Sequence, residues 1–364
     1  SLYALDLGAQ PFAVGTLAAM LYVLPLLLAW RVGVLFDRVG ARWLLVFGYA
    51  GGALGILIPF FVRSLPALYV SALLCGISLA FSNVIQQSLV GILSSPQERT
   101  RNFSNFAMIV SSSTFVGPLM TGFAIDQWGH AAACLLIALA PLAALAMLLV
   151  RGGLFAGWQR GAAEGGSIWR SLADPAIHRV LAVSSLVQFG IDLFQFYIPL
   201  YGHGIGLSAS AIGIALAAYA VAAFAARFAM PRLIKLLGEE GLLSRSFWLG
   251  AVCFLLLPAT HNAVALASVA FLFGLCMGCA GPLTLMLMFS QSAEGRAGEA
   301  MGLRLTANYL TRMVGPSVFG LIASAFGLLP VFVLNALMMA AGGRLSRPQP
   351  VASVRGKGPK GDSP

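Results

Sequence analysis

The chain is a succession of long apolar stretches separated by short polar or charged segments. A membrane core about 30 Å thick requires about 20 apolar residues of helix. Stretches of that kind predict transmembrane helices at 11–32, 43–62, 67–93, 103–125, 131–150, 179–201, 210–230, 244–260, 264–290, 300–325 and 328–343. The pattern therefore predicts an all-α integral membrane protein with about 11 spans.

Composition supports this class of protein. Hydrophobic residues make up 59% of the 364 positions and charged residues only 9%. A soluble fold of this size needs far more polar residues to cover its surface. The lipid bilayer is accordingly the first predicted partner.

The net charge of +10 raises the question of nucleic-acid binding. If the turn at 31–42 is cytoplasmic, all of the 22 Lys and Arg residues except Arg63 and Arg312 fall at cytoplasmic ends, loops or tail. This is the positive-inside distribution of a membrane protein. It predicts contact with the anionic inner leaflet and no nucleic-acid partner.

The two halves of the sequence are related by a shift of 198 positions. Leu2 and Tyr3 fall on Leu200 and Tyr201, without a gap. Eight early glycines fall on glycines under the same shift: Gly8, Gly15, Gly40, Gly52, Gly76, Gly117, Gly122 and Gly129. An internal repeat of this kind predicts two homologous bundles with one common orientation in the membrane.

The repeat also predicts the domain organisation. Six helices are expected in each half, but the first half begins only where Leu2 and Tyr3 match the outer end of a span. We therefore expect a parent protein of twelve helices whose first helix is missing here. The predicted parts are an N-terminal bundle at 1–150, a cytoplasmic linker at 151–178 with a short surface helix near Trp169, a C-terminal bundle at 179–343 and a disordered basic cytoplasmic tail at 344–364.

The cysteines and histidines do not indicate a metal or redox site. All five cysteines lie inside apolar spans, where packing is the favoured interpretation even for the closely spaced Cys276 and Cys279. The four histidines lie far apart in sequence, without metal-ligand spacing. No metal and no cofactor are predicted.

The first predicted cytoplasmic turn is short and highly charged. It contains the ordered set Gly33, Asp37, Arg38, Gly40 and Arg42. A glycine at the first of these positions lets two helices approach closely, and Gly40 permits a tight turn. A carboxylate beside cations can be held by a helix N-terminus.

This turn and the duplication resemble the major facilitator superfamily. The resemblance implies a fold of 6+6 helices in two pseudo-symmetric bundles. It also implies that Asp37, assisted by Arg38, docks on the inner end of span eleven and stabilises the outward-facing state. Anchoring of the topology alone is the alternative role. In the second half Pro231, Lys235 and Gly238 stand at the positions of Gly33, Asp37 and Gly40, so the carboxylate exists on one side only.

A second motif repeats in both halves. Gly117, Pro118 and Gly122 resemble part of the span-five motif of antiporters in this superfamily, and such residues bend helices. Its recurrence as Gly315, Pro316 and Gly320 indicates a general bend, so the motif gives antiport only slight support. Many proton-coupled antiporters of the superfamily carry an arginine in span four, and 67–93 contains none, which argues against proton antiport.

Charged groups at membrane depth usually face a bundle interior or a water-filled path. Asp192 and Arg312 are the two clear cases, at similar predicted depth. Polar residues at helical spacing accompany them in three stripes, and the predicted substrate or proton path consists of Asn83, Gln86, Gln87, Gln188, Asp192, Gln195, Asn308 and Arg312. The alternative is that Asp192 and Arg312 form a structural ion bridge within the second bundle.

The predicted function is secondary transport of a small organic solute by alternating access, with proton coupling left open and efflux slightly favoured. The alternatives are uptake of an organic anion and a transporter-like sensor or scaffold without flux. No enzyme is predicted, because a phosphate-binding loop and a nucleophile with a nearby base are both absent. We expect a monomer in a bacterial-type cytoplasmic (inner) membrane.

Overall fold

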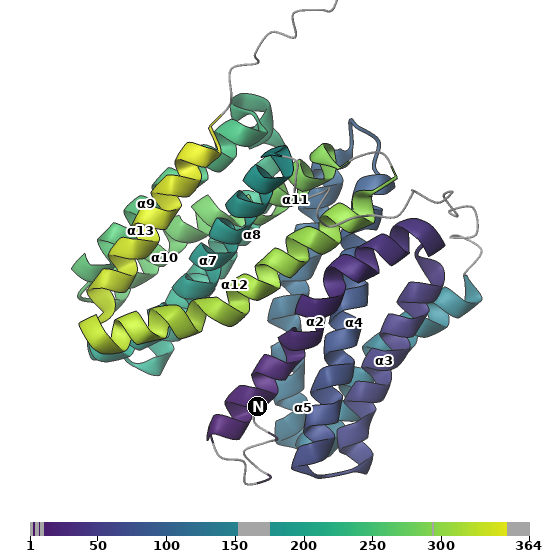
Figure 1. Ribbon diagram of the computed structural model, residues 1–364. Coiled ribbons are helices and arrows are strands. Elements are labelled where there is room, and N and C mark those ends of the chain that lie inside the picture. The colour runs from purple at the N-terminus through teal and green to yellow at the C-terminus, as the bar shows by residue number, and fades with distance from the viewer. Residues whose placement is uncertain (1–2, 4–6, 8–10, 152–174, 293–294, 348–364) are drawn as a thin grey trace, which may run out of the picture.

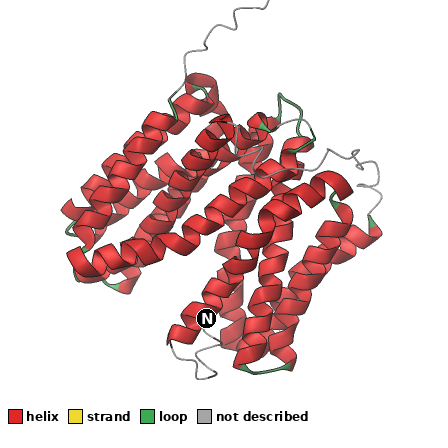
Figure 2. Ribbon diagram, in the orientation of Figure 1, coloured by secondary structure: helices red, strands yellow, loops and turns green. Residues whose placement is uncertain are grey.

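The computed structural model describes residues 3, 7, 11–151, 175–292 and 295–347. Within these ranges the chain consists of helices and short connections (Figure 2). The predicted linker helix near Trp169, most of the tail and most of the first ten residues lie outside the described residues. The N-terminal bundle contains α2 (Pro11–Val39), α3 (Arg42–Phe61), α4 (Leu65–Ile92) and α5 (Arg99–Val150).

The C-terminal bundle contains seven further helices and one short 3₁₀ turn. They are α7 (Pro175–Gly204), α8 (Ala209–Leu237), α9 (Glu239–Leu256), η2 (Leu257–Ala259), α10 (Ala263–Gly278), α11 (Ala280–Gln291), α12 (Ala297–Phe326) and α13 (Leu328–Leu345). The predicted all-α fold with two bundles is confirmed.

The predicted boundary between the spans at 103–125 and 131–150 falls within α5, where Gly129 breaks the helix: its φ of 78° and ψ of 170° are not helical. The predicted span at 264–290 consists of α10 and α11, which meet at Cys279 and together form one apolar segment, Ala263–Gln291, long enough to cross a membrane. The apolar pattern continues through Cys279 and so does not reveal this junction.

Nine helices among the described residues are long and apolar enough to cross a membrane. The remaining two predicted spans are the first part of α5 and the whole of α12, which are helical over the predicted ranges. In α12 the charged and polar side chains include Arg304 and Asn308, which are buried.

The duplication is reproduced in the backbone. Helices α2 and α8 begin 198 positions apart and end 198 positions apart. Gly40 and Gly238 both have positive φ, as do Gly129 and Gly327. Such dihedrals are readily adopted only by glycine, so these positions end or break helices in both halves. The paired glycines of the repeat are therefore matched turns.

The two bundles meet chiefly along α2 with α12 and along α5 with α8. Helix α4 also contacts α12 and α11, and α5 contacts α11. Figure 1 shows α2 and α12 lying together near the C-terminus of α2 and diverging toward the opposite ends. We call the end at which Val39 and Ala297 lie the closed end, and the other end the open end.

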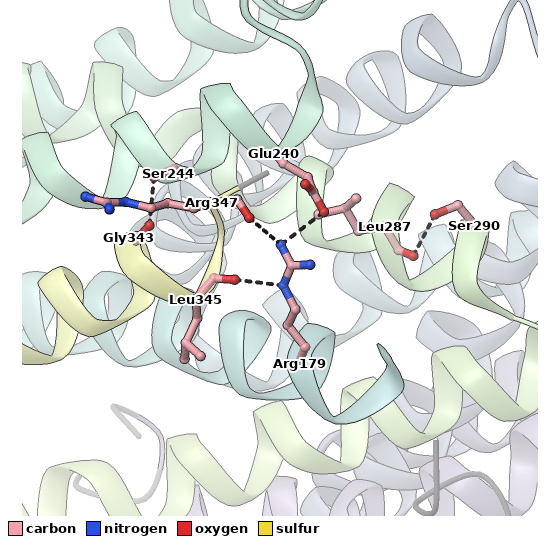
Figure 3. A network of polar contacts seen from close by, with 8 residues as sticks. All are labelled: Arg179, Glu240, Ser244, Leu287, Ser290, Gly343, Leu345 and Arg347. Carbon is pink, nitrogen blue, oxygen red and sulfur yellow. Dashed lines mark hydrogen bonds and ion pairs between the residues drawn. The ribbon is translucent and has the colours of Figure 1, made fainter. Parts of the chain in front are cut away.

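The C-terminal bundle is tied together at the closed end by Arg179 (Figure 3). Its Nε donates to the carbonyl of Leu345 at 2.7 Å, and one terminal nitrogen donates to the carbonyl of Arg347 at 2.9 Å and to Oε1 of Glu240 at 3.0 Å. The last carbonyls of a helix have no partner within it. Arg179 therefore caps α13 and links it to the first turns of α7 and α9.

Candidate functional site

The two bundles touch backbone to backbone along α2 and α12. A Cβ placed on Gly33 would overlap the carbonyl oxygen of Gly298, and one on Gly302 would overlap the carbonyl oxygen of Ala29. Glycine is the only residue that allows such an approach. The predicted close approach at Gly33 is thus an approach to α12.

Asp37 completes this contact. Its Oδ1 accepts a hydrogen bond from the backbone N–H of Gly298 and its Oδ2 accepts one from the N–H of Glu299, each at 2.8 Å. The first N–H groups of a helix lack partners, and a carboxylate is favoured there by the helix dipole. Arg296, which precedes α12, provides no side-chain cap. Asp37 supplies the cap from the other bundle, and we call this pair of bonds the Asp37 latch.

Arg38 is not part of the latch. It is exposed, and no hydrogen bond or ion pair joins it to Asp37 among the described residues. No contact among the described residues therefore supports the expected assistance of Asp37 by Arg38. The cation beside the latch is Arg296, whose guanidinium lies 2.6 Å from Oε2 of the buried Glu299. Arg42 instead lies over the ring of Trp43, beyond the turn made by Gly40 with a φ of 85°.

The stripe in α4 divides between two directions. The Nδ2 of Asn83 donates to the hydroxyl of Tyr309 at 3.0 Å, and Oε1 of Gln87 accepts from Arg304 at 2.8 Å, so both reach across to α12. The Nε2 of Gln86 donates to Tyr49 at 2.6 Å and remains within its own bundle. Two of the three predicted residues of this stripe therefore face the other bundle.

The stripe in α7 is organised around Asp192. Its Oδ2 lies 3.2 Å from Nε of Arg312, and its Oδ1 accepts from Gln188 at 2.8 Å. Gln195 lies close to Tyr219 of α8 and belongs to a separate contact. The side chain of Arg312 is 40% exposed and that of Asp192 is 20% exposed, so the pair lies at the edge of the bundle contact.

The face of α12 that carries Arg304, Asn308, Tyr309 and Arg312 joins these stripes into one network, which we call the α12 polar face. Ser184 of α7 accepts from Arg304 at 3.0 Å and donates to Oδ1 of Asn308 at 3.2 Å. The rings of Tyr22 and Tyr309 are 6.2 Å apart, and the guanidinium of Arg312 lies 5.9 Å from the Tyr22 centroid.

Sequence reasoning missed several members of this network. Arg304 shares the spacing of four with Asn308 and Arg312, so the sequence placed it in their stripe, but not in the predicted path. No sequence signal pointed to Tyr22, Tyr309 or Ser184, because a lone hydroxyl-bearing residue in an apolar span usually serves packing.

The second bundle contact, between α5 and α8, depends on Arg227. Its side chain donates to Ser111 of α5 and, at 2.9 Å, to the carbonyl of Gly278, while its own carbonyl accepts from Ser104. The sequence placed Arg227 at a cytoplasmic helix end, and the structure places it between helices. We call this contact the Arg227 seam.

The backbone is helical through both predicted bend motifs. Gly117, Pro118 and Gly122 lie in α5, and Gly315, Pro316 and Gly320 lie in α12. A Cβ on Gly315 would press against the ring of Phe189, so this glycine allows close packing of α12 on α7. The bend itself stays a prediction.

Comparison with known families decides the classification. The family model described as Major Facilitator Superfamily matches residues 1–310 and 180–363. The chain belongs to the major facilitator superfamily. It is accordingly a membrane transporter and not an enzyme. No curated protein sequence matches it.

Solved structures of the superfamily share the fold. The human organic anion transporter MFSD10 (TETRAN) aligns with a TM-score of 0.77 over 95% of this chain and 88% of its own, at 19% identity. The major facilitator superfamily transporter FucP in the outward conformation aligns with a TM-score of 0.77 over 93% of this chain and 90% of its own, at 13% identity. At such identities the likeness concerns the fold alone.

Proposed function

We propose that this superfamily member moves a small organic solute by alternating access, and that the Asp37 latch holds the outward-facing state. The observation that supports this most directly is the unequal spacing of α2 and α12. They touch through glycine backbone at the closed end and diverge toward the open end (Figure 1). A rocking motion that exchanged the two ends would have to break the latch.

The distribution of charge favours a cytoplasmic closed end. The basic residues at helix ends on this side are Arg31, Arg38, Arg42, Arg99, Arg101, Arg151, Arg179, Arg232, Lys235, Arg245, Arg296, Arg344 and Arg347. The positive-inside rule places such an end in the cytoplasm. The described state is then open to the outside of a bacterial-type inner membrane. Efflux is the direction we favour.

Reconstitution in proteoliposomes tests the proposal. Spin labels placed on α2 and α12 at the closed end would report distances by double electron–electron resonance, and uptake of a broad solute panel would be measured in parallel. We expect two distance populations and movement of at least one solute. A single unchanging distance with no flux above protein-free liposomes would favour the sensor or scaffold alternative.

Proton coupling at Asp192 is a second candidate function, supported by the exposed position of its pair with Arg312. Protonation of Asp192 would remove the negative partner of Arg312 and free both side chains. Uptake measured as a function of pH in the Asp192→Asn variant is the test. A pH profile that matches the unmodified protein would assign Asp192 a structural role and exclude coupling through it.

A further inference from the structure

Arg304 is a buried cation between the bundles without an acidic partner. Its side chain belongs to a residue that is only 6% exposed. Its two described hydrogen bonds go to neutral oxygens, those of Ser184 and Gln87. Its Nε–H is buried and has no partner among the described residues.

A guanidinium held in this way is costly. A buried charge usually has an opposite charge beside it, and an unpaired one loses hydration without compensation. The other arginine of the α12 polar face, Arg312, has Asp192 as its partner. The polar face therefore carries one positive charge in excess. A cationic solute would be repelled there, and an anionic group would be attracted.

The partners of Arg304 come from different bundles. Ser184 lies on α7, in the same bundle as Arg304, and Gln87 lies on α4, in the other. When the bundles part at the closed end, Ser184 stays and Gln87 leaves. The guanidinium edge that Gln87 now covers, together with the unpaired Nε–H, is then free for a planar anionic group, which arginine binds with two parallel hydrogen bonds.

We propose that Arg304 is an anion-binding site that forms when the closed end opens, and that the transported solute carries a carboxylate, sulfonate or phosphate group that docks there. Gln87 occupies this position with its neutral amide oxygen in the present state. This inference rests on the proposed alternating-access function and adds to it the charge of the solute and the residue that recognises it.

The distance between the two arginines fits a solute that moves along one helix face. Arg304 and Arg312 are eight residues apart on α12, about 12 Å along the helix axis. Arg304 lies nearer than Arg312 to Ala297, the closed end of α12, and the side chain of Arg312 is 40% exposed. An anionic group can reach Arg312 from the side of the open end and Arg304 from the side of the closed end.

The test uses the full chain in proteoliposomes with three pairs of probes, each an anion and an uncharged analogue of similar shape. They are gluconate and sorbitol, hippurate and hippuramide, and naphthalene-1-sulfonate and its sulfonamide. Uptake above protein-free liposomes is measured for each probe, with closed-end distances measured in parallel. We expect uptake of at least one anion, none of its uncharged partner, and a shift toward closed-end opening when that anion is added.

Variants separate recognition from structure. Arg304→Gln is expected to raise the half-saturation concentration of the anion about tenfold or more, and Arg304→Lys to raise it less, because the charge remains. Gln87→Glu is also expected to raise the half-saturation concentration, since the new carboxylate then pairs with the guanidinium of Arg304 and competes with the solute. Gln291→Glu makes the same change at an exposed site of the closed end and should leave it unaltered.

The outcomes distinguish the two proposals. If Gln87→Glu raises thermal stability while the half-saturation concentration stays the same, Arg304 is structural and the inference is overturned. Alternation of the closed end with equal uptake of uncharged partners, or with no uptake of any anion, overturns the inference and leaves the transport proposal standing. Absence of both alternation and uptake overturns both.

Discussion

Asp192 and Arg312 lie 120 positions apart in the sequence and form an ion pair of 3.2 Å between α7 and α12. Both helices belong to the C-terminal bundle, so the pair does not itself hold the bundles together. Gln188 supports the carboxylate from one turn earlier on α7. The pair therefore fixes α12 against α7 and presents Arg312 to Tyr22 of the other bundle.

A double-mutant cycle should reveal this pairing. Asp192→Asn and Arg312→Gln are each expected to lower stability, and the combined variant should lose less than the sum, with a coupling energy of about 1 kcal/mol because both side chains are partly exposed. Thermal unfolding in detergent measures the effect. Strict additivity would show that the two side chains do not interact.

Asp37→Asn should weaken the closed end. The asparagine loses the negative charge and offers one acceptor oxygen where the carboxylate offers two, at a cost of about 2 kcal/mol, or roughly a 30-fold change in the ratio of states. Closed-end distances should lengthen and transport should slow while folding stays intact. Glu98→Gln is the control, since Glu98 is exposed and pairs with Arg101 near the start of α5. Unchanged distances and flux in Asp37→Asn would remove the latch role.

Gly33→Ala should hold the closed end apart. The added methyl group meets the carbonyl of Gly298, and such overpacking costs about 1–3 kcal/mol. Solvent access to a cysteine introduced on this end of α12 would rise. Gly213→Ala makes the same change in α8, where nothing lies within 4 Å, and should leave access unchanged. Equal access in both variants would contradict the backbone contact.

Arg179→Gln should affect stability without affecting the conformational equilibrium. The variant leaves the carbonyls of Leu345 and Arg347 and the carboxylate of Glu240 without their shared donor. Because Arg179 is partly exposed, a loss of about 1–2 kcal/mol is expected. Thermal unfolding would measure it, with closed-end distances as the second reading. A shift in those distances would mean that the network also governs the state of the transporter.

The sequence was sufficient for most of the fold. Apolar stretches located the helices and the 198-residue shift identified the two bundles, because both follow from the chain's own periodicity. The junction of α10 and α11 at Cys279 was not foreseen, because the apolar pattern continues through it.

The candidate site was only partly predictable. Helical spacing placed Gln87 and Arg312 on polar stripes, but it could not show which stripe meets which. Arg304 lay in the α12 stripe and was passed over, because its lack of an acidic neighbour becomes visible only when α4 and α7 are packed against it. Arg227 was assigned to a helix end, because its contacts with α5 and α10 become visible only when those helices are packed against α8.

The duplication gives the two bundle contacts the same backbone plan but different chemistry. The contact of α2 with α12 depends on two hydrogen bonds to one carboxylate. The Arg227 seam has no such carboxylate, because the exposed Lys235 stands where the second copy would need one, and a lysine cannot accept a hydrogen bond. The two sides of the molecule will therefore separate at different free-energy costs, and side chains, not helix geometry, set the order in which they do so.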